Sequence, residues 1–318
     1  MNTEKRILFG VDASEFALQA VTAVGGLLAH STDYGITLFY GAPDPNLPFL
    51  SKALGLGPEE LRHLERVCSL EETNVLEQAK QALTGSGFDS HRIEMICKAK
   101  CKDPAYQMLQ LAAKEGYETL ALGLRGPAQA ARKLMGSVAY KLAHLADDQT
   151  LWVVDPRISS RDVLVALVGA PISKRVVDHV VTYLSHLTDS RFTFFHVTPP
   201  MPPQYWDEAR ILDAKERQER EEQIDQWMKG YTERVEAIAV EGKEKLIQAG
   251  VPEENVTVKI QPQDRGIARD ILEELESNNY GILVIGRKGS KEIDQFGLGS
   301  KAHKLLHNGH ALAICVVN

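Results

Sequence analysis

The stretch GLRGPAQAARKLMGS, residues 123–137, returns in altered form as GRKGSKEIDQFGLGS, residues 286–300. Three glycines and a serine keep their spacing in both copies: Gly123, Gly126, Gly136 and Ser137 in the first, and Gly286, Gly289, Gly299 and Ser300 in the second. Average glycine usage is about 7%, so three glycines would match preset positions by chance roughly four times in ten thousand. The match therefore predicts an internal duplication of the chain.

The segments around the two copies repeat as well. Apolar runs that read as strands alternate with segments of helical periodicity, and the strands are expected at 6–12, 35–41, 92–98, 118–123 and 150–155, then at 162–169, 191–197, 255–260, 281–286 and 311–317. Counted along the chain, Gly169 takes the place of Asp12, and six extra residues of the second half fall in a long charged segment around 204–249. The predicted domains are residues 1–157 and 158–318.

Strands that alternate with helices favour right-handed crossovers and a parallel sheet with helices on both faces. The runs LVALV and ILVI are apolar throughout, which is typical of strands buried on both faces. We therefore predict the α/β class, with two tandem doubly wound domains that each contain a five-stranded parallel sheet. A ligand of such a domain binds at the carboxyl ends of the strands, where the winding reverses.

The composition argues against several classes of protein. The chain is 44% hydrophobic and 25% charged, which is typical of a soluble globular protein. Lys and Arg number 16 against 19 Asp and Glu in residues 1–157, and 20 against 24 in the rest, so no basic excess predicts nucleic-acid binding. Without an apolar run of about 18 residues, a signal-peptide pattern or a disulfide framework, we expect neither a membrane partner nor secretion, and predict a cytoplasmic location.

The repeated glycine loop has a physical reading as an anion site. Gly123 and Gly286 end the predicted fourth strands, where a residue without a Cβ lets a flat ligand approach the backbone. Gly136 and Gly299 precede a helix, whose first N–H groups and positive dipole end attract anions, and the serine hydroxyl adds a hydrogen bond. The loops therefore predict phosphate pockets. The alternative is that these glycines serve only as turn and cap residues.

The spacing G-x2-G-x9-G-[S/T] resembles the ATP-binding signature of the universal stress protein family. The acid that closes RILFGVDAS (6–14) is similar to the first motif of that family, and Asp-Pro at the start of a helix in KDPAYQML (102–109) also fits it. The resemblance covers nearly the whole chain as two consecutive domains. It implies an adenine nucleotide alpha hydrolase-like fold and a cleft for ATP or AMP.

The resemblance also implies a role for each matching residue. In the first domain Asp12 would reach the ribose or a phosphate-bound Mg²⁺, Gly41 would flank the adenine, and the rest would line the nucleotide or hold its phosphates: Gly123, Gly126, Gly136, Ser137 and Val138. The corresponding residues of the second domain are Val197, Gly286, Gly289, Gly299, Ser300 and Lys301. Lys301 would add a charge near the phosphates, whereas Gly169 offers no carboxylate. We therefore expect two unequal sites, of which the first is tighter.

No other motif indicates catalysis or a resident metal. Cys97 and Cys101 are not at a recognised metal spacing, and His303, His307 and His310 share a helix face without a Cys or a carboxylate nearby in sequence. The patterns G-x-S-x-G, GxxxxGK[ST] and HExxH are missing, and no residues read as a nucleophile with its base. We predict a stress-response protein that acts through conformation and protein partners rather than catalysis. A nucleotide-free dimerisation scaffold and a slow ATPase remain as alternatives.

The last apolar strand of each half would form an exposed edge unless it were covered. The family resemblance implies that these edges pair, with residues 150–155 and 311–317 at the interface. The chain would then be an intramolecular pseudo-dimer, and a homodimer of whole chains is left open.

Overall fold

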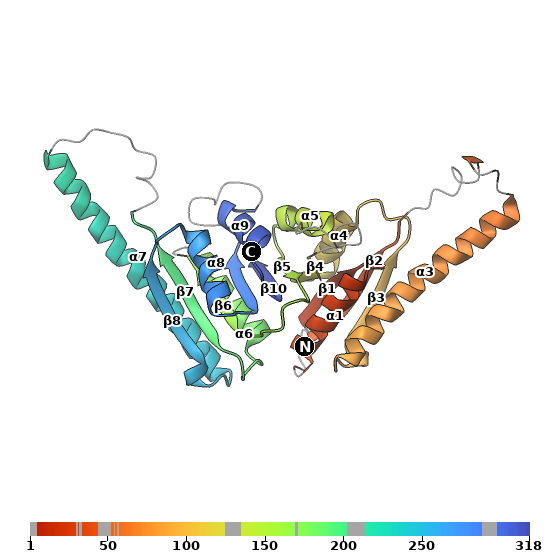
Figure 1. Ribbon diagram of the computed structural model, residues 1–318, viewed down its shortest axis with the longest axis horizontal. Coiled ribbons are helices and arrows are strands. Elements are labelled where there is room, and N and C mark those ends of the chain that lie inside the picture. The colour runs from red at the N-terminus through yellow and green to blue at the C-terminus, as the bar shows by residue number, and fades with distance from the viewer. Residues whose placement is uncertain are drawn as a thin grey trace. The chain divides into compact units, whose positions relative to one another are not determined.

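The computed structural model describes residues 5–29, 31, 34–43, 52–53, 55, 57–124, 135–168, 171–201, 214–287 and 298–318. The chain divides into two compact units, Met1–Ile158 and Ser159–Asn318. Figure 1 shows that each unit alternates strands with helices along its length. Three glycines named above, Gly126, Gly169 and Gly289, lie outside the described residues.

Both units use the same order of elements. The first contains β1 (Lys5–Val11), α1 (Glu15–Leu28), β2 (Tyr34–Gly41), α3 (Pro58–Gly85), β3 (Ile93–Lys98), α4 (Pro104–Glu115), β4 (Thr119–Gly123), α5 (Ser137–Leu145) and β5 (Thr150–Val154). The second contains β6 (Val163–Leu167), α6 (Ile172–Leu184), β7 (Phe192–Thr198), α7 (Ala214–Gln248), β8 (Val256–Pro262), α8 (Ile267–Ser277), β9 (Ile282–Gly286), α9 (Ser300–Asn308) and β10 (Ala313–Val317).

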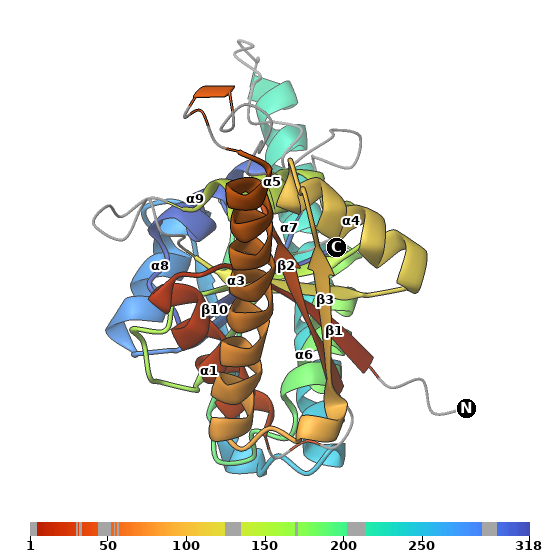
Figure 2. The same ribbon diagram turned by 90° about the vertical axis from the view of Figure 1, so that its right-hand side faces the viewer.

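The strand order is β3-β2-β1-β4-β5 in the first unit and β8-β7-β6-β9-β10 in the second. The neighbouring strands within each unit pair in parallel. The chain moves outward from β1 to β3 and then returns past β1 to β4, so right-handed crossovers put the early and late helices on opposite faces. Accordingly α1 packs with α3, as Figure 2 shows, and α4 packs with α5. The predicted α/β class and tandem parallel sheets are confirmed.

Local sequence explains where the helices begin and end. Ser14 precedes α1 and its hydroxyl accepts a hydrogen bond from the backbone N–H of Ala17, and Asp103 caps α4 in the same way through Tyr106. Gly116 ends α4 with a φ of 74°, a left-handed conformation that glycine adopts without strain. The strands between these helices are largely apolar, and β5, β6 and β10 are buried at every residue.

Strand pairing gives the register between the two copies. Ile7 corresponds to Val163, 156 positions later, because each pairs with the equivalent residue of its fourth strand. Ile93 corresponds to Val256, 163 positions later. The second unit therefore holds seven extra residues between these points, and α7 has 35 residues where α3 has 28. Asp12 then corresponds to Val168, so the assignment to Gly169 and the count of six extra residues were each wrong by one.

Candidate functional site

The carboxyl ends of β1, β2 and β4 bring several predicted residues to one edge of the first unit. Asp12 directly follows β1, Gly41 is the last residue of β2, and Gly123 is the last residue of β4. These strands are parallel neighbours, so their carboxyl ends lie at the same edge. Gly136 is the N-cap of α5, and its N–H donates to the carbonyl of Leu124, which directly follows β4. The start of α5 therefore lies at this edge as well.

Asp12 has a local structural contact in addition to its predicted role. Its Oδ1 atom accepts hydrogen bonds from the Ser14 backbone N–H at 2.9 Å and from the Ser14 hydroxyl. No side chain or backbone group of the described residues donates to Oδ2. The carboxylate therefore holds the turn before α1 with one oxygen and keeps an acceptor for a ligand hydroxyl or a metal ion with the other.

Close packing requires a glycine at position 41, whether or not a ligand binds. A Cβ at this position would lie 2.9 Å from the Sγ atom of Cys101 and 3.2 Å from Cγ of Pro104, at the start of α4. Gly286 is similar, because its Cβ would lie 2.7 Å from Cγ1 of Ile172, the first residue of α6. At both positions the bare backbone allows a helix start to approach the end of a strand.

The two loops after the fourth strands close in the same way. Gly136 has φ −63° and ψ 151°, and Gly299 has φ −60° and ψ 148°, which other residues also adopt. The Gly136 N–H donates to Leu124 over 2.8 Å, and the Gly299 N–H donates to the carbonyl of Arg287 over 3.1 Å. These glycine N–H groups are thus used within the chain. An anion at the start of α5 would instead meet the backbone N–H groups of Ser137 and Val138, because no described residue accepts a hydrogen bond from them.

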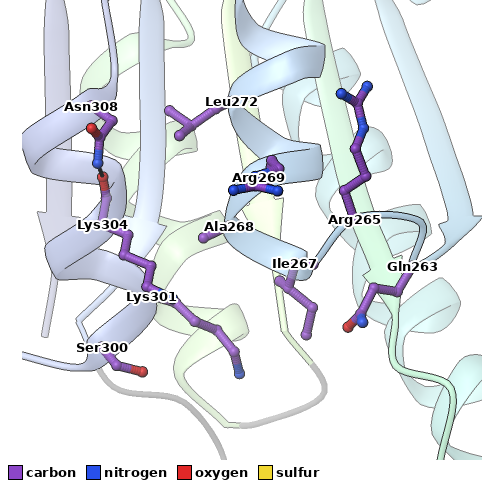
Figure 3. Close-up of a pocket in the computed structure, with 11 residues that line it drawn as sticks. Gln263, Arg265, Ile267, Ala268, Arg269, Leu272, Ser300, Lys301, Lys304 and Asn308 are labelled. Carbon is purple, nitrogen blue, oxygen red and sulfur yellow. Dashed lines mark hydrogen bonds between the residues drawn. The ribbon is translucent and has the colours of Figure 1, made fainter.

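The second unit has a pocket of about 690 Å³ between α8 and α9, and its lining extends along α9 from Ser300 to Asn308 (Figure 3). Two predicted residues, Ser300 and Lys301, line it, whereas Val197 and Gly286 do not. Arg265, Arg269 and Lys304 bring further positive charge, and the described residues that line the pocket include no aspartate or glutamate. The predicted phosphate end of the second site is therefore a cationic cavity.

A buried histidine lies next to the predicted adenine end of the second site. His196 is 2% exposed, precedes Val197 in β7, and its Nδ1 atom lies 2.9 Å from the carbonyl oxygen of Leu167. Burial lowers the pKa of His196, the hydrogen bond to Leu167 opposes that change, and the charge of Lys301 adds to it. Lys301 is therefore close enough to the end of β7 to act on this imidazole electrostatically. By strand register Tyr40 takes this place in the first unit, and burial together with Glu71 raises its pKa.

Some site residues did not follow from the sequence reasoning. Arg269 and Lys304 line the cationic pocket, yet neither belongs to the repeated glycine motif. A comparison of the two copies at the 163-residue offset would have indicated Arg269, because Tyr106 stands in its place, but not Lys304, because Lys141 is also a lysine. Within the described part of the chain, no three His, Cys, Asp or Glu side chains gather in a way that could hold a metal ion. None of the described helices is long and apolar enough to cross a membrane.

Comparisons with known proteins agree with the duplication. The model of the universal stress protein family matches residues 4–153 and again residues 160–314. A universal stress protein from Archaeoglobus fulgidus shares the fold over 99% of both chains at 17% identity, with a TM-score of 0.62. A protein from Pseudomonas aeruginosa PAO1 does so over 99% of this chain and 93% of its own, at 11% identity and a TM-score of 0.57. Among curated proteins none matches this chain in sequence. The two family-model matches together cover most of the chain, which therefore belongs to the universal stress protein family as two consecutive copies of its domain.

Proposed function

We propose that the first unit binds an adenine nucleotide, ATP or AMP, at the carboxyl edge of its sheet, and that the second unit holds a weaker site. The observation that carries this proposal is the start of α5, held at the edge where Asp12 keeps one carboxylate oxygen without a described donor. The same loop closure recurs at α9 with nearly the same backbone angles. Asp12 holds the turn before α1 through Oδ1 alone, so Oδ2 remains available to a ligand at this edge.

In this proposal the carboxylate of Asp12 binds a ribose hydroxyl or a nucleotide-bound Mg²⁺. Gly41 and Gly123, which end β2 and β4, and Gly126 let the base and sugar lie against the backbone. The N–H groups of Ser137 and Val138 and the Ser137 hydroxyl bind phosphate, aided by the positive end of the α5 dipole. The second site uses Val197, Gly286, Gly289, Gly299, Ser300 and Lys301.

We further propose that the bound nucleotide acts through conformation and protein partners rather than through turnover. General acid–base or nucleophilic catalysis needs a base within hydrogen-bond reach of the attacking group. The ionisable side chain that we place against the nucleotide in the first unit is Asp12, and its Oδ1 atom is occupied by Ser14. Binding thus has a structural basis at this edge, whereas turnover would need a base that the proposal does not supply.

The test is a calorimetric titration of the purified protein with ATP and AMP, together with analysis of nucleotide released on heating. We compare Gly136→Val with Gly85→Val, because a Cβ at Gly85 meets nothing within 4 Å. The backbone angles of Gly136 suit valine, so we expect ATP affinity to fall at least about tenfold by steric exclusion of phosphate, while Gly85→Val binds normally.

Three results would contradict the proposal. No released nucleotide and no heat of binding in the wild type would favour the nucleotide-free scaffold. Steady production of ADP would favour the slow ATPase. Unfolding of Gly136→Val in the absence of ligand would show that the glycine is needed for packing alone.

A further inference from the structure

The pocket between α8 and α9 is lined by four cationic side chains. Arg265 and Arg269 come from the start of α8, and Lys301 and Lys304 come from the first turns of α9 (Figure 3). Arg265 contributes least, since it is paired with Glu273 and its guanidinium points away from α9 in Figure 3. Arg269 and Lys304 form no ion pair with any described residue. The cavity is therefore lined by at least two cations that no described carboxylate neutralises.

The first unit has a different arrangement at the matching place. Asp103 caps α4 and its carboxylate forms an ion pair with Lys141 of α5 over 2.7 Å. At the 163-residue offset Gly266 stands in the place of Asp103, and Lys304 stands in the place of Lys141. The lysine is thus kept in the second unit, while its carboxylate partner is lost.

Two further replacements add charge to the second unit. Arg269 stands in the place of Tyr106, and Lys301 stands in the place of Val138. Lys100 and Lys102 match Gln263 and Arg265, so over all the positions that line the pocket the formal charge is +2 in the first unit and +4 in the second. Like charges that share one cavity repel each other, so such a cluster is stabilised by a bound anion.

We propose that this pocket is an anion site of the second unit alone, and that it takes the phosphate groups of a small polyphosphate-bearing molecule. Arginine presents a planar fork to phosphate oxygens and lysine adds a compact charge, a combination suited to phosphate. A volume of about 690 Å³ lies within the range of small-molecule pockets. The site shares Ser300 and Lys301 with the proposed nucleotide cleft, yet its recognition rests on charge and needs no adenine.

The test is a calorimetric titration with inorganic pyrophosphate, which carries the charge without the nucleoside. Arg269→Tyr and Lys301→Val introduce the residues of the first unit at the matched positions. Arg234→Tyr is the control, because it makes the same substitution at an exposed arginine of α7 that does not line the pocket. Melting of each variant without ligand checks that it is folded.

We expect one pyrophosphate per chain for the wild type and an affinity about five- to tenfold weaker for Arg269→Tyr and for Lys301→Val, with Arg234→Tyr within twofold. Added salt should weaken wild-type binding, because the contacts are charged and partly exposed. No binding in the wild type, or an equal loss in all three variants, would overturn the proposal. ATP binding at the first unit should persist in Arg269→Tyr, because Arg269 lines only the pocket of the second unit, so a failure here is distinguishable from a failure of nucleotide binding in the first unit.

Discussion

The two oxygens of Asp12 allow its structural and ligand-binding roles to be separated by mutation. Oδ1 holds the Ser14 N–H at 2.9 Å, and the Ser14 hydroxyl in turn accepts from the Ala17 N–H at 3.2 Å. Asp12→Asn keeps an oxygen that can accept from Ser14 but removes the charge. Ser14→Ala keeps the carboxylate but removes the hydroxyl that caps α1. The two variants therefore change different properties of the same turn.

The magnitudes follow from these contacts. A hydrogen bond from a ribose hydroxyl to a charged carboxylate is worth about 1.5–3 kcal/mol, so Asp12→Asn should weaken ATP binding at the first site by about ten- to a hundredfold. Its free energy of unfolding should change by less than about 0.5 kcal/mol, as for surface substitutions that keep their contacts. Ser14→Ala should lower the free energy of unfolding by about 1 kcal/mol, the usual cost of losing an N-cap, and leave ATP affinity within about twofold.

Calorimetry with ATP gives the affinities, and urea unfolding gives the stability of the first unit. Trp152 is the single tryptophan of residues 1–158, so its fluorescence reports on that unit once Trp206 and Trp227 are replaced by phenylalanine in every variant. An unchanged dissociation constant in Asp12→Asn would refute the role of the carboxylate. An equal loss of affinity in Ser14→Ala would mean that the shape of the turn, rather than its charge, binds the nucleotide.

Two further predictions concern the start of α4. Asp103→Ala should lower the free energy of unfolding by about 1–2 kcal/mol at pH 7, because it removes both an N-cap and the ion pair with Lys141. The bond from Lys141 holds the pKa of Asp103 below its ordinary value of 3.8, so urea unfolding should show the difference between wild type and variant shrink as pH falls through that lowered pKa; a constant difference would contradict this. Gly41→Ala should cost about 1–3 kcal/mol through the contact with Sγ of Cys101, and Cys101→Ala in the same chain should recover part of that cost; strictly additive effects in urea unfolding would exclude the contact as the cause.

The fold was predictable because its signals repeat. Duplicated glycine spacing, alternating apolar runs and caps such as Asp103 all indicated the same doubly wound units. The predicted alignment of the first copy with the second was wrong by one residue at Gly169. An apolar run such as the one before Gly169 does not show which of its residues pairs with which residue of the neighbouring strand. The pairing of Val163 with Ile282 in the sheet determines this alignment. The pairing of the two halves through their last strands stays a prediction.

The candidate site was less predictable, because its properties depend on contacts between segments that are far apart in the sequence. Gly41 meets Cys101 only after β2 and α4 have packed, so its packing role is invisible in the sequence. The hydrogen bond from Gly136 to Leu124 similarly depends on how the loop after β4 closes. The packing of α8 against α9 places Arg269 beside the repeated motif, although Arg269 lies 30 positions before Gly299 in the sequence.

The two units differ in charge at the start of their helices. The first unit uses carboxylates there, Asp12 before α1 and Asp103 before α4. The second has Val168 and Gly266 instead, and Gly266 is the N-cap residue of α8, which therefore has no side-chain cap. A helix start favours nearby negative charge, which Asp103 supplies to α4 from within the chain. Arg269, Lys301 and Lys304 surround the corresponding place at α8. A phosphate bound there would supply the negative charge that Asp103 supplies in the first unit.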